Sequence, residues 1–215
     1  MSTRDIVQDI VKHTAGLGFI TSVKVTGTDE STTLDAMDAD RTVILQAKLH
    51  NTVEEFNGEF GLGNLGFLAG VTALGNYQTD DATVEVVARD RNGVSSPDHL
   101  MFRDADGNTD QYRFMSKEII EQTLQTVKFK GVEWDVTLEP TKAKVNELQQ
   151  VAGIYGGIEP NFTVKTEGTD LIVTVGAADG SFTGKRTFAQ NVNGEITEGY
   201  AWPLAQVLAI LKLGM

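Results

Sequence analysis

Acidic and amide side chains stand at every second position within residues 103–114, a spacing that can coordinate calcium. These side chains are Asp104, Asp106, Asn108 and Asp110. An EF-hand loop also needs glycine at its sixth position and a bidentate glutamate at its twelfth, but counting from Asp104 these positions hold Thr109 and Met115. Asp106 and Gly107 lie between apolar flanks and suit a hairpin turn. The pattern therefore predicts a turn between two strands and no metal site.

Residues 61–66, GLGNLG, match the glycine spacing of a dinucleotide-binding loop. That loop directly follows a buried strand, whereas residues 51–60 are polar and charged. We therefore expect a glycine-rich loop, a cap at Asn64 and a helix whose apolar residues share one face. A nucleotide-binding enzyme built on Gly61–Gly66 stays as a competing hypothesis.

The sequence contains no other set of residues typical of catalysis. Cysteine is absent, and the three histidines, His13, His50 and His99, are isolated from one another. Adjacent acids such as Glu54 with Glu55 are typical of solvated loops. We expect no enzyme, no catalytic residue, no metal and no cofactor.

Length and charge limit the remaining possibilities. The 215 residues suffice for two domains of about 100 residues each. No apolar run approaches the roughly 20 residues of a membrane span, so we expect neither a membrane partner nor a leader. The net charge of −12 repels nucleic acid at long range, but it does not describe how the charges are distributed.

An internal repeat organises the chain. Residues 6–75 and 144–214 align with an offset of 138 to 139 positions, and the matches fall on helix ends and strands. We predict an α+β fold of two similar domains, each with two helices packed on an antiparallel sheet. The expected limits are 1–125 with a connector to about 140, and 141–215. The second domain lacks a counterpart of the first domain's last strands, so we expect a chain that ends early, with a shorter second domain as the alternative.

Two segments resemble the sliding clamps of T-even-type bacteriophages. They are NELQQVAGIYGGIEPNFTVKTEGTDLIVTVG (146–176) and FNGEFGLGNLGFLAGVTAL (56–74). The resemblance implies a homotrimeric ring around duplex DNA, with helices lining the hole and strands forming the outer wall. It also implies a DNA polymerase tethered by the ring, an ATP-driven clamp loader as partner, and the cytoplasm of an infected bacterial host.

Charge agrees with helices that face DNA. A surplus of two positive charges lies on the helices expected at 2–15, 64–75, 141–155 and 203–213. Because the net charge of the chain is −12, the remaining residues sum to −14. A few phosphate contacts of this kind bind duplex weakly and without reading sequence, which suits sliding. The expected DNA-facing residues are Arg4, Lys12, Lys142, Lys144 and Lys212. Ordinary solvated helix faces are the alternative.

The resemblance also implies two protein-binding regions. The subunit interface would pair the strand at 111–115 with the strand at 182–188, using Gln111, Tyr112, Arg113, Phe114, Thr183, Lys185 and Arg186. The basic pair 185–186 would then lie near the acidic turn 104–110 and steer association. A pocket for a partner's peptide would use Ile119, Ile120, Val127 and Phe129 in the connector, although the family's connector is proline-rich and this one has only Pro140. A virion structural or adhesion protein of two antiparallel domains is the alternative function.

Overall fold

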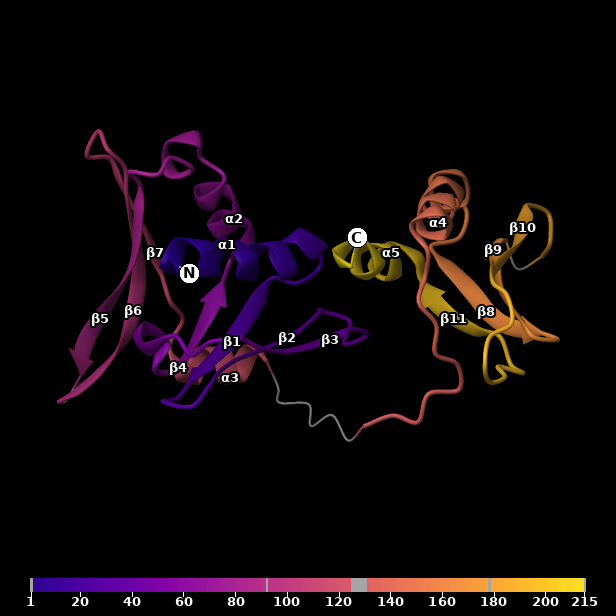
Figure 1. The fold of residues 1–215 in the computed structure, drawn as a ribbon, viewed down its shortest axis with the longest axis horizontal. Coiled ribbons are helices and arrows are strands. Elements are labelled where there is room, and N and C mark those ends of the chain that lie inside the picture. Colours follow the sequence, from indigo (N-terminus) through magenta and orange to yellow (C-terminus); the bar gives the residue numbers. More distant parts are fainter. Residues whose placement is uncertain (1, 92, 125–130, 178, 215) are drawn as a thin grey trace. The chain divides into compact units, whose positions relative to one another are not determined.

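A computed structural model describes residues 2–91, 93–124, 131–177 and 179–214. The chain divides into two compact units, residues 1–128 and 129–215, and each is described by itself (Figure 1). The division falls inside the connector expected from the sequence.

The described residues of unit 1 (residues 1–128) form two antiparallel sheets and three α-helices. The helices are α1 (Thr3–His13), α2 (Leu65–Thr72) and α3 (Lys117–Thr123). The first sheet has the order β3-β2-β1-β4, with bounds Ile44–Lys48, Thr32–Met37, Ser22–Gly27 and Gly58–Gly63. The second has the order β5-β6-β7, with bounds Thr83–Arg91, Val94–Arg103 and Thr109–Arg113. An antiparallel bridge between Gly61 and Met115 joins the edge of the first sheet to the segment that follows the second.

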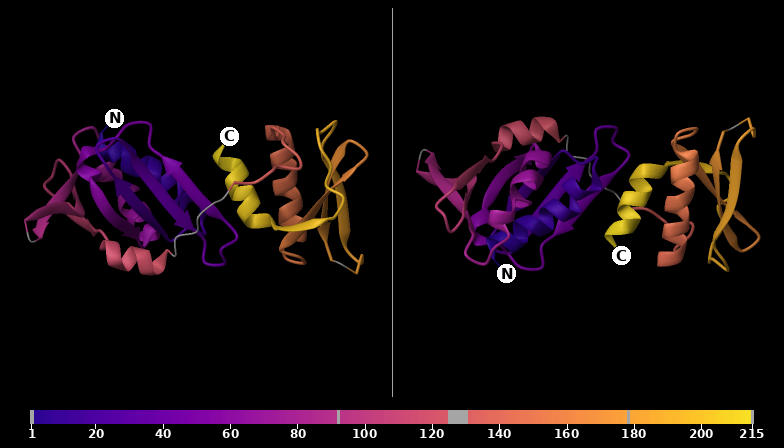
Figure 2. Two further views of the ribbon diagram at one scale, coloured as in Figure 1. Left: turned by 90° about the horizontal axis from the view of Figure 1, so that it is seen from below. Right: turned by 90° about the horizontal axis from the view of Figure 1, so that it is seen from above.

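Unit 2 (residues 129–215) repeats the first half of this plan. It contains α4 (Lys142–Tyr155), then β8 (Asn161–Glu167), β9 (Asp170–Gly176), β10 (Thr183–Ala189) and β11 (Tyr200–Pro203), and finally α5 (Leu204–Leu213). Its sheet order, β10-β9-β8-β11, matches β3-β2-β1-β4 strand for strand. Figure 2 shows both helices of this unit on the same side of its sheet. The structure thus confirms an α+β fold with two similar halves built from antiparallel sheets.

Local signals explain where the helices begin. Ser2 caps α1 in a capping box with Asp5, because the Ser2 hydroxyl accepts from the Asp5 amide and the Asp5 carboxylate accepts from the Ser2 amide. Thr141 caps α4 by accepting from the Lys144 amide. Asn64 occupies the predicted N-cap position of α2, but it lies in the left-handed region with φ 53° and makes no side-chain cap bond.

The core of unit 1 lies between its helices and both sheets. Val23 and Val25 of β1 are fully buried, while Lys24 between them points to the opposite face of the sheet. The second sheet contributes further buried residues to this core, and Phe114 follows its last strand directly. The buried residues of the sheet are Val84, Leu100, Phe102 and Tyr112.

The acidic segment that begins at Asp104 is the turn of a hairpin, as predicted. Gly107 adopts φ 85°, and β6 pairs with β7 on either side of the turn. The Asp104 carboxylate accepts from the Asn76 side chain at 2.7 Å, and Asp110 accepts from the Tyr77 hydroxyl at 2.7 Å. Burial and the Asp110 carboxylate raise the pKa of Tyr77 to about 12. These carboxylates therefore fasten the turn to the residues before β5.

The GLGNLG segment forms β4 and the start of α2, so the predicted glycine-rich loop is wrong for residues 61–63. Gly61 lies beneath Ile120 of α3, and a Cβ atom placed there would be 2.7 Å from the Ile120 side chain. A Cβ atom at Gly63 would collide with the Met115 sulfur at 2.4 Å. These two glycines are required by packing of α3 and Met115 on the strand.

Candidate functional site

The five basic residues predicted to face DNA differ in how much of their charge is available. Lys12 in the last turn of α1, Lys142 in the first turn of α4 and Lys212 in the last turn of α5 are exposed. Arg4 is half-buried and donates to the carbonyl oxygens of Thr79 and Ala82. It therefore anchors α1 to the segment that leads into β5.

Lys144 is also engaged within its own unit. Its ammonium lies 2.8 Å from the Glu147 carboxylate, one helical turn away. The Arg186 guanidinium approaches the same carboxylate at 3.9 Å. Of the five predicted residues, Lys12, Lys142 and Lys212 are therefore the exposed ones.

The first predicted interface strand, β7, is an edge strand with one neighbour, β6, in its sheet. The Phe114 amide donates to the Asp98 carbonyl, and the Asp104 amide donates to the Asn108 carbonyl. Along an edge strand, the backbone amide and carbonyl of one residue bond to the neighbouring strand and those of the next residue point outward, away from it. The amides and carbonyls of Gln111 and Arg113 therefore point away from β6. Met115, next in this series, uses its outward groups to bond with Gly61 at 2.7 and 2.9 Å. The outward groups of 111 and 113 are thus placed for pairing with another strand.

The side chains of this segment divide between core and surface. Tyr112 and Phe114 are 4% and 8% exposed, and their rings contact α2 and β4. The buried Tyr112 hydroxyl donates to the Gly63 carbonyl. Tyr112 and Phe114 are therefore core residues, and their backbone groups are directed at β6 and not at the open edge. Gln111 and Arg113 are exposed, and Arg113 pairs with Asp98 at 3.1 Å.

The second predicted interface strand, β10, is likewise an edge strand with β9 as its neighbour. The Ala177 amide donates to the Phe182 carbonyl. By the same alternation, the backbone groups of Thr183 and Lys185 point to the open edge, while Arg186 bonds toward β9. The Lys185 ammonium pairs with Glu167, so its charge already has a local partner.

The predicted peptide pocket is only partly described. Ile119 on α3 is 52% exposed, whereas Ile120 is fully buried beside Gly61. Ile120 is therefore a core residue of unit 1. Val127 and Phe129 lie outside the described residues.

Helix α3 and its ion-pair network were missed by the sequence analysis, which assigned these residues to the connector. The Glu59 carboxylate lies 2.8 Å from both the Lys24 and the Lys117 ammonium groups, and Lys24 also contacts Glu121 at 3.2 Å. The hydrogen bonds from Lys117 and Lys24 lower the pKa of Glu59. The detectable signal was Ser116 ahead of Ile120 and Leu124, which stand four residues apart.

No family model matches the chain, and no curated protein matches its sequence. Among solved structures, the chain is similar to PCNA from Thermococcus kodakaraensis, with a TM-score of 0.62 and 13% identity over 99% of this chain and 82% of that one. It is also similar to A. fulgidus PCNA bound to the C-terminal region of FEN-1, with a TM-score of 0.63 and 8% identity over 99% of this chain and 81% of that one. The chain has the fold of a sliding clamp.

The clamp fold covers both units, because the alignments leave about one residue in a hundred of this chain unmatched. Within the parts of the chain that the structure describes, no group of three or more His, Cys, Asp or Glu residues could hold a metal ion. No helix there is both long enough and apolar enough to cross a membrane.

Proposed function

We propose that this protein is a DNA sliding clamp, a processivity factor that encircles duplex DNA as a homotrimeric ring and has no catalytic activity of its own. The observation that carries the proposal is the repeated arrangement of two helices on an antiparallel sheet, which matches clamp structures over 99% of the chain. The sequence resemblance to T-even-type phage clamps adds a DNA polymerase and an ATP-driven loader as partners, in the cytoplasm of an infected bacterium.

The contact with DNA would be weak and independent of sequence. Lys12, Lys142 and Lys212 are exposed on helices, and each can reach one phosphate at a time. Arg4 and Lys144 contribute less because protein oxygens already accept their hydrogen bonds. In this proposal the closed ring, and not a dense basic groove, keeps the protein on DNA.

The ring would close through backbone pairing between two edge strands. The outward groups of Gln111 and Arg113 on β7 would bond with those of Thr183 and Lys185 on β10 of the next copy. A heterologous contact of this kind forms a ring when its rotation closes after a fixed number of copies.

A partner peptide would bind near α3. Ile119 presents an exposed apolar side chain there, and the A. fulgidus PCNA structure contains the C-terminal region of FEN-1 as its bound partner. We expect the polymerase to bind there through a short apolar peptide.

Edge pairing is tested by the solution mass. Gln111→Pro removes an outward amide while leaving the bonds to β6 in place, and Gln111→Ala keeps that amide. Light scattering should give a trimer for the native chain and for Gln111→Ala, and a monomer for Gln111→Pro. A trimer that persists in the proline variant would reject this interface.

Encirclement predicts that the amount of bound protein depends on whether the ends of the DNA are free. A closed ring can thread onto linear duplex, so crosslinking to DNA with free ends should exceed crosslinking to the same DNA with both ends blocked by bulky protein. Neutralising Lys12, Lys142 and Lys212 together should weaken capture and reduce its salt dependence. Equal crosslinking to free and blocked DNA would contradict encirclement.

A further inference from the structure

An open cavity of about 630 Å³ in unit 1 brings together residues that are far apart in the sequence. It is lined by α1 on one side and by β2, β3 and the residues after β3 on the other. His13 and His50 both line it, together with Asp9 of α1. The apolar residues of the lining are Ile6, Ile10, Leu34, Ala47, Leu49 and Val53. The cavity thus combines an apolar wall with one carboxylate and two imidazole rings.

Asp9 receives no cation from the sheet. Its carboxylate lies 3.2 Å from Nδ1 of His13, one helical turn away, and its side chain is 50% exposed. Among the described residues that line the cavity, Lys48 carries the one permanent positive charge. Lys48 pairs with Thr33, and side chains alternate along β3, so the Lys48 side chain points to the face of the sheet opposite Ala47.

Strand register identifies equivalent positions in the two units. The equivalent pairs on the side of β4 and β11 are Val25–Phe60 with Val164–Tyr200, and Lys24–Gly61 with Thr163–Ala201. The equivalent pairs toward the other edge are Val25–Leu34 with Val164–Val173, and Leu34–Ala47 with Val173–Arg186. Ala47 of unit 1 therefore occupies the position of Arg186 in unit 2.

The repeat gives the equivalent residues of the two helices. The offset that aligns residues 10–20 with residues 148–158 also aligns Ile6 with Lys144 and Asp9 with Glu147. In unit 2 the Glu147 carboxylate lies 2.8 Å from the Lys144 ammonium and 3.9 Å from the Arg186 guanidinium. Both of these cations are replaced in unit 1 by apolar residues that line the cavity.

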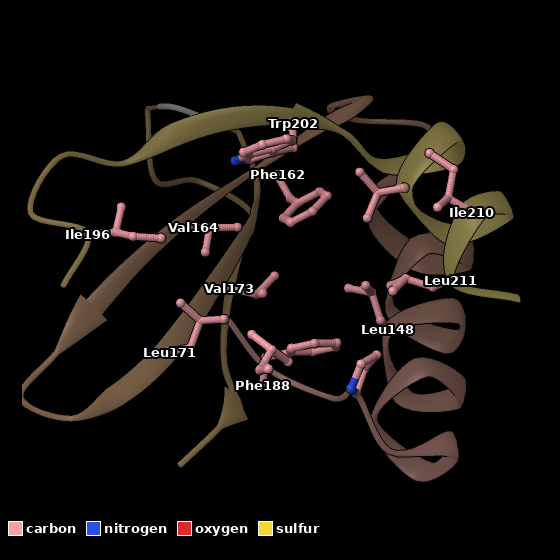
Figure 3. A pocket seen from close by; sticks show the side chains of 13 residues that line it. Leu148, Phe162, Val164, Leu171, Val173, Phe188, Ile196, Trp202, Ile210 and Leu211 are labelled. Carbon is pink, nitrogen blue, oxygen red and sulfur yellow. The ribbon is translucent and has the colours of Figure 1, made fainter. Parts of the chain in front are cut away.

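Unit 2 has a cavity of another kind. It measures about 340 Å³, and Figure 3 shows Leu148 and Leu211 of the helices facing Phe162 and Val173 of the sheet across it. Among the described residues, its lining contains no charged side chain. Glu147 lies outside that lining and has its own cations. The open space beside the carboxylate is therefore a feature of unit 1.

The chemistry of the unit 1 cavity suits a guanidinium group. A guanidinium is planar and weakly hydrated, stacks on flat aromatic faces and pairs with carboxylates. His13 and His50 supply the flat rings, and Asp9 supplies the carboxylate. The apolar wall can cover the methylene groups that carry the cation. The volume falls within the range of roughly 300 to 1,000 Å³ that is usual for small-ligand sites.

We propose that this cavity binds an alkylguanidinium group, carried by an arginine side chain or by a free guanidinium compound, in the place that Arg186 takes in unit 2. The cation pairs with Asp9 and lies against His13 and His50. The lining belongs to unit 1 and contains none of the residues proposed to contact DNA, the next copy or a partner peptide. The site therefore does not depend on the clamp function.

The test follows the histidine ring signals by NMR in the full chain, in mildly alkaline buffer where free imidazole is neutral. The probe is N-acetyl-arginine amide, and the matched control is N-acetyl-citrulline amide, which has a similar shape without the charge. We expect saturable shifts of the His13 and His50 signals at arginine amide concentrations on the order of 1 mM, and binding of the citrulline amide about tenfold weaker or less. His99, which bonds to Asp98 on β6, is the internal reference and should not shift. No shift at His13 and His50, or equal shifts with both compounds, would overturn the proposal.

Variants of the protein locate the site. Ala47→Arg places the residue of unit 2 into the cavity and should abolish the shift at His50. Asp9→Asn should weaken binding about tenfold, again read at His50 because this substitution itself alters the His13 signal. Gln46→Arg lies on the opposite face of the sheet and should bind the probe like the native chain. Native-strength binding by the Ala47 or the Asp9 variant would contradict the proposed position of the cation.

A peptide distinguishes the two sources of the group. This probe is a heptapeptide with one arginine between two leucines, and its control has citrulline in place of the arginine. Binding about tenfold tighter than that of the arginine amide would assign the cavity to an arginine of another polypeptide. Equal or weaker binding would assign it to a free guanidinium compound.

Discussion

The two units share one sheet order and one pair of helices but differ in how their cores are closed. In unit 1, the sheet β5-β6-β7 and α3 complete the core, and the described aromatic ring pairs all lie there. In unit 2, residues at equivalent register positions remain about half exposed beside a cavity. The repeated half of the fold therefore sets the strand order, while segments outside the repeat decide how much apolar surface leaves water.

Equivalent aromatic residues should give the largest contrast. Phe60→Ala removes a buried ring and leaves a cavity under Phe114, so we expect the free energy of unfolding of unit 1 to fall by about 4 kcal/mol. Tyr200→Ala removes a half-exposed ring and should cost unit 2 less than about 1 kcal/mol. Urea unfolding followed by hydrogen exchange in each unit measures both, and equal losses would break the comparison.

The pair Gly61 and Ala201 tests the role of α3. Gly61→Ala forces a new Cβ atom against Ile120, so α3 must shift, and we expect a loss of about 3 kcal/mol with faster exchange in α3. Ala201→Gly adds backbone freedom at an exposed edge and should cost below about 1 kcal/mol. Unchanged exchange in α3 of the Gly61 variant would show that α3 is not held by this contact.

A buried carboxylate in unit 1 predicts a dependence on pH. Asp98 is 8% exposed, and its hydrogen bond from His99, with the nearby Arg113, lowers its pKa below the ordinary value of 3.8. The stabilisation is therefore complete above pH 3.8 and is lost as pH falls through the lowered pKa. Asp98→Asn should lower the free energy of unfolding by about 2 kcal/mol at pH 7, and this difference should vanish in strong acid. A difference that stays constant down to the lowest pH would contradict the charge-based explanation.

The smallest expected effects compare two carboxylates that each contact two lysines. Glu59 joins Lys24 and Lys117, and Lys24 is 17% exposed, so Glu59→Gln should cost about 1 kcal/mol and loosen α3. Glu167 joins Lys165 and Lys185, which are 46% and 56% exposed, so Glu167→Gln should leave thermal unfolding unchanged. A larger effect at Glu167 than at Glu59 would reverse the assigned importance of burial.

Strong local signals made several elements predictable. The capping box at Ser2, the hairpin turn at Gly107 and the spacing of apolar residues in α4 each depend on neighbours within a few residues. The repeat between residues 6–75 and 144–214 was also legible, because equivalent helices and strands need similar apolar patterns.

The candidate site was less predictable. The exposed lysines of α1, α4 and α5 follow from helix positions, but the local partners of Arg4, Lys144 and Lys185 are residues from elsewhere in the fold or the next helical turn. The resemblance implied an edge strand at 111–115, but it did not indicate that the rings of Tyr112 and Phe114 cover α2 and β4.

By itself, the sequence determined every described α-helix except α3, the antiparallel sheets, the repeat and the absence of cysteine chemistry, because periodicity and composition are local or additive properties. Only the tertiary structure decided that GEFGLG is a strand, that Ile120 lies over Gly61, and that Tyr200 and Trp202 of β11 are about half exposed. The physical reason is that glycine weakens a strand unless another segment approaches closely or the strand bends, and exposure depends on which distant segment covers a surface.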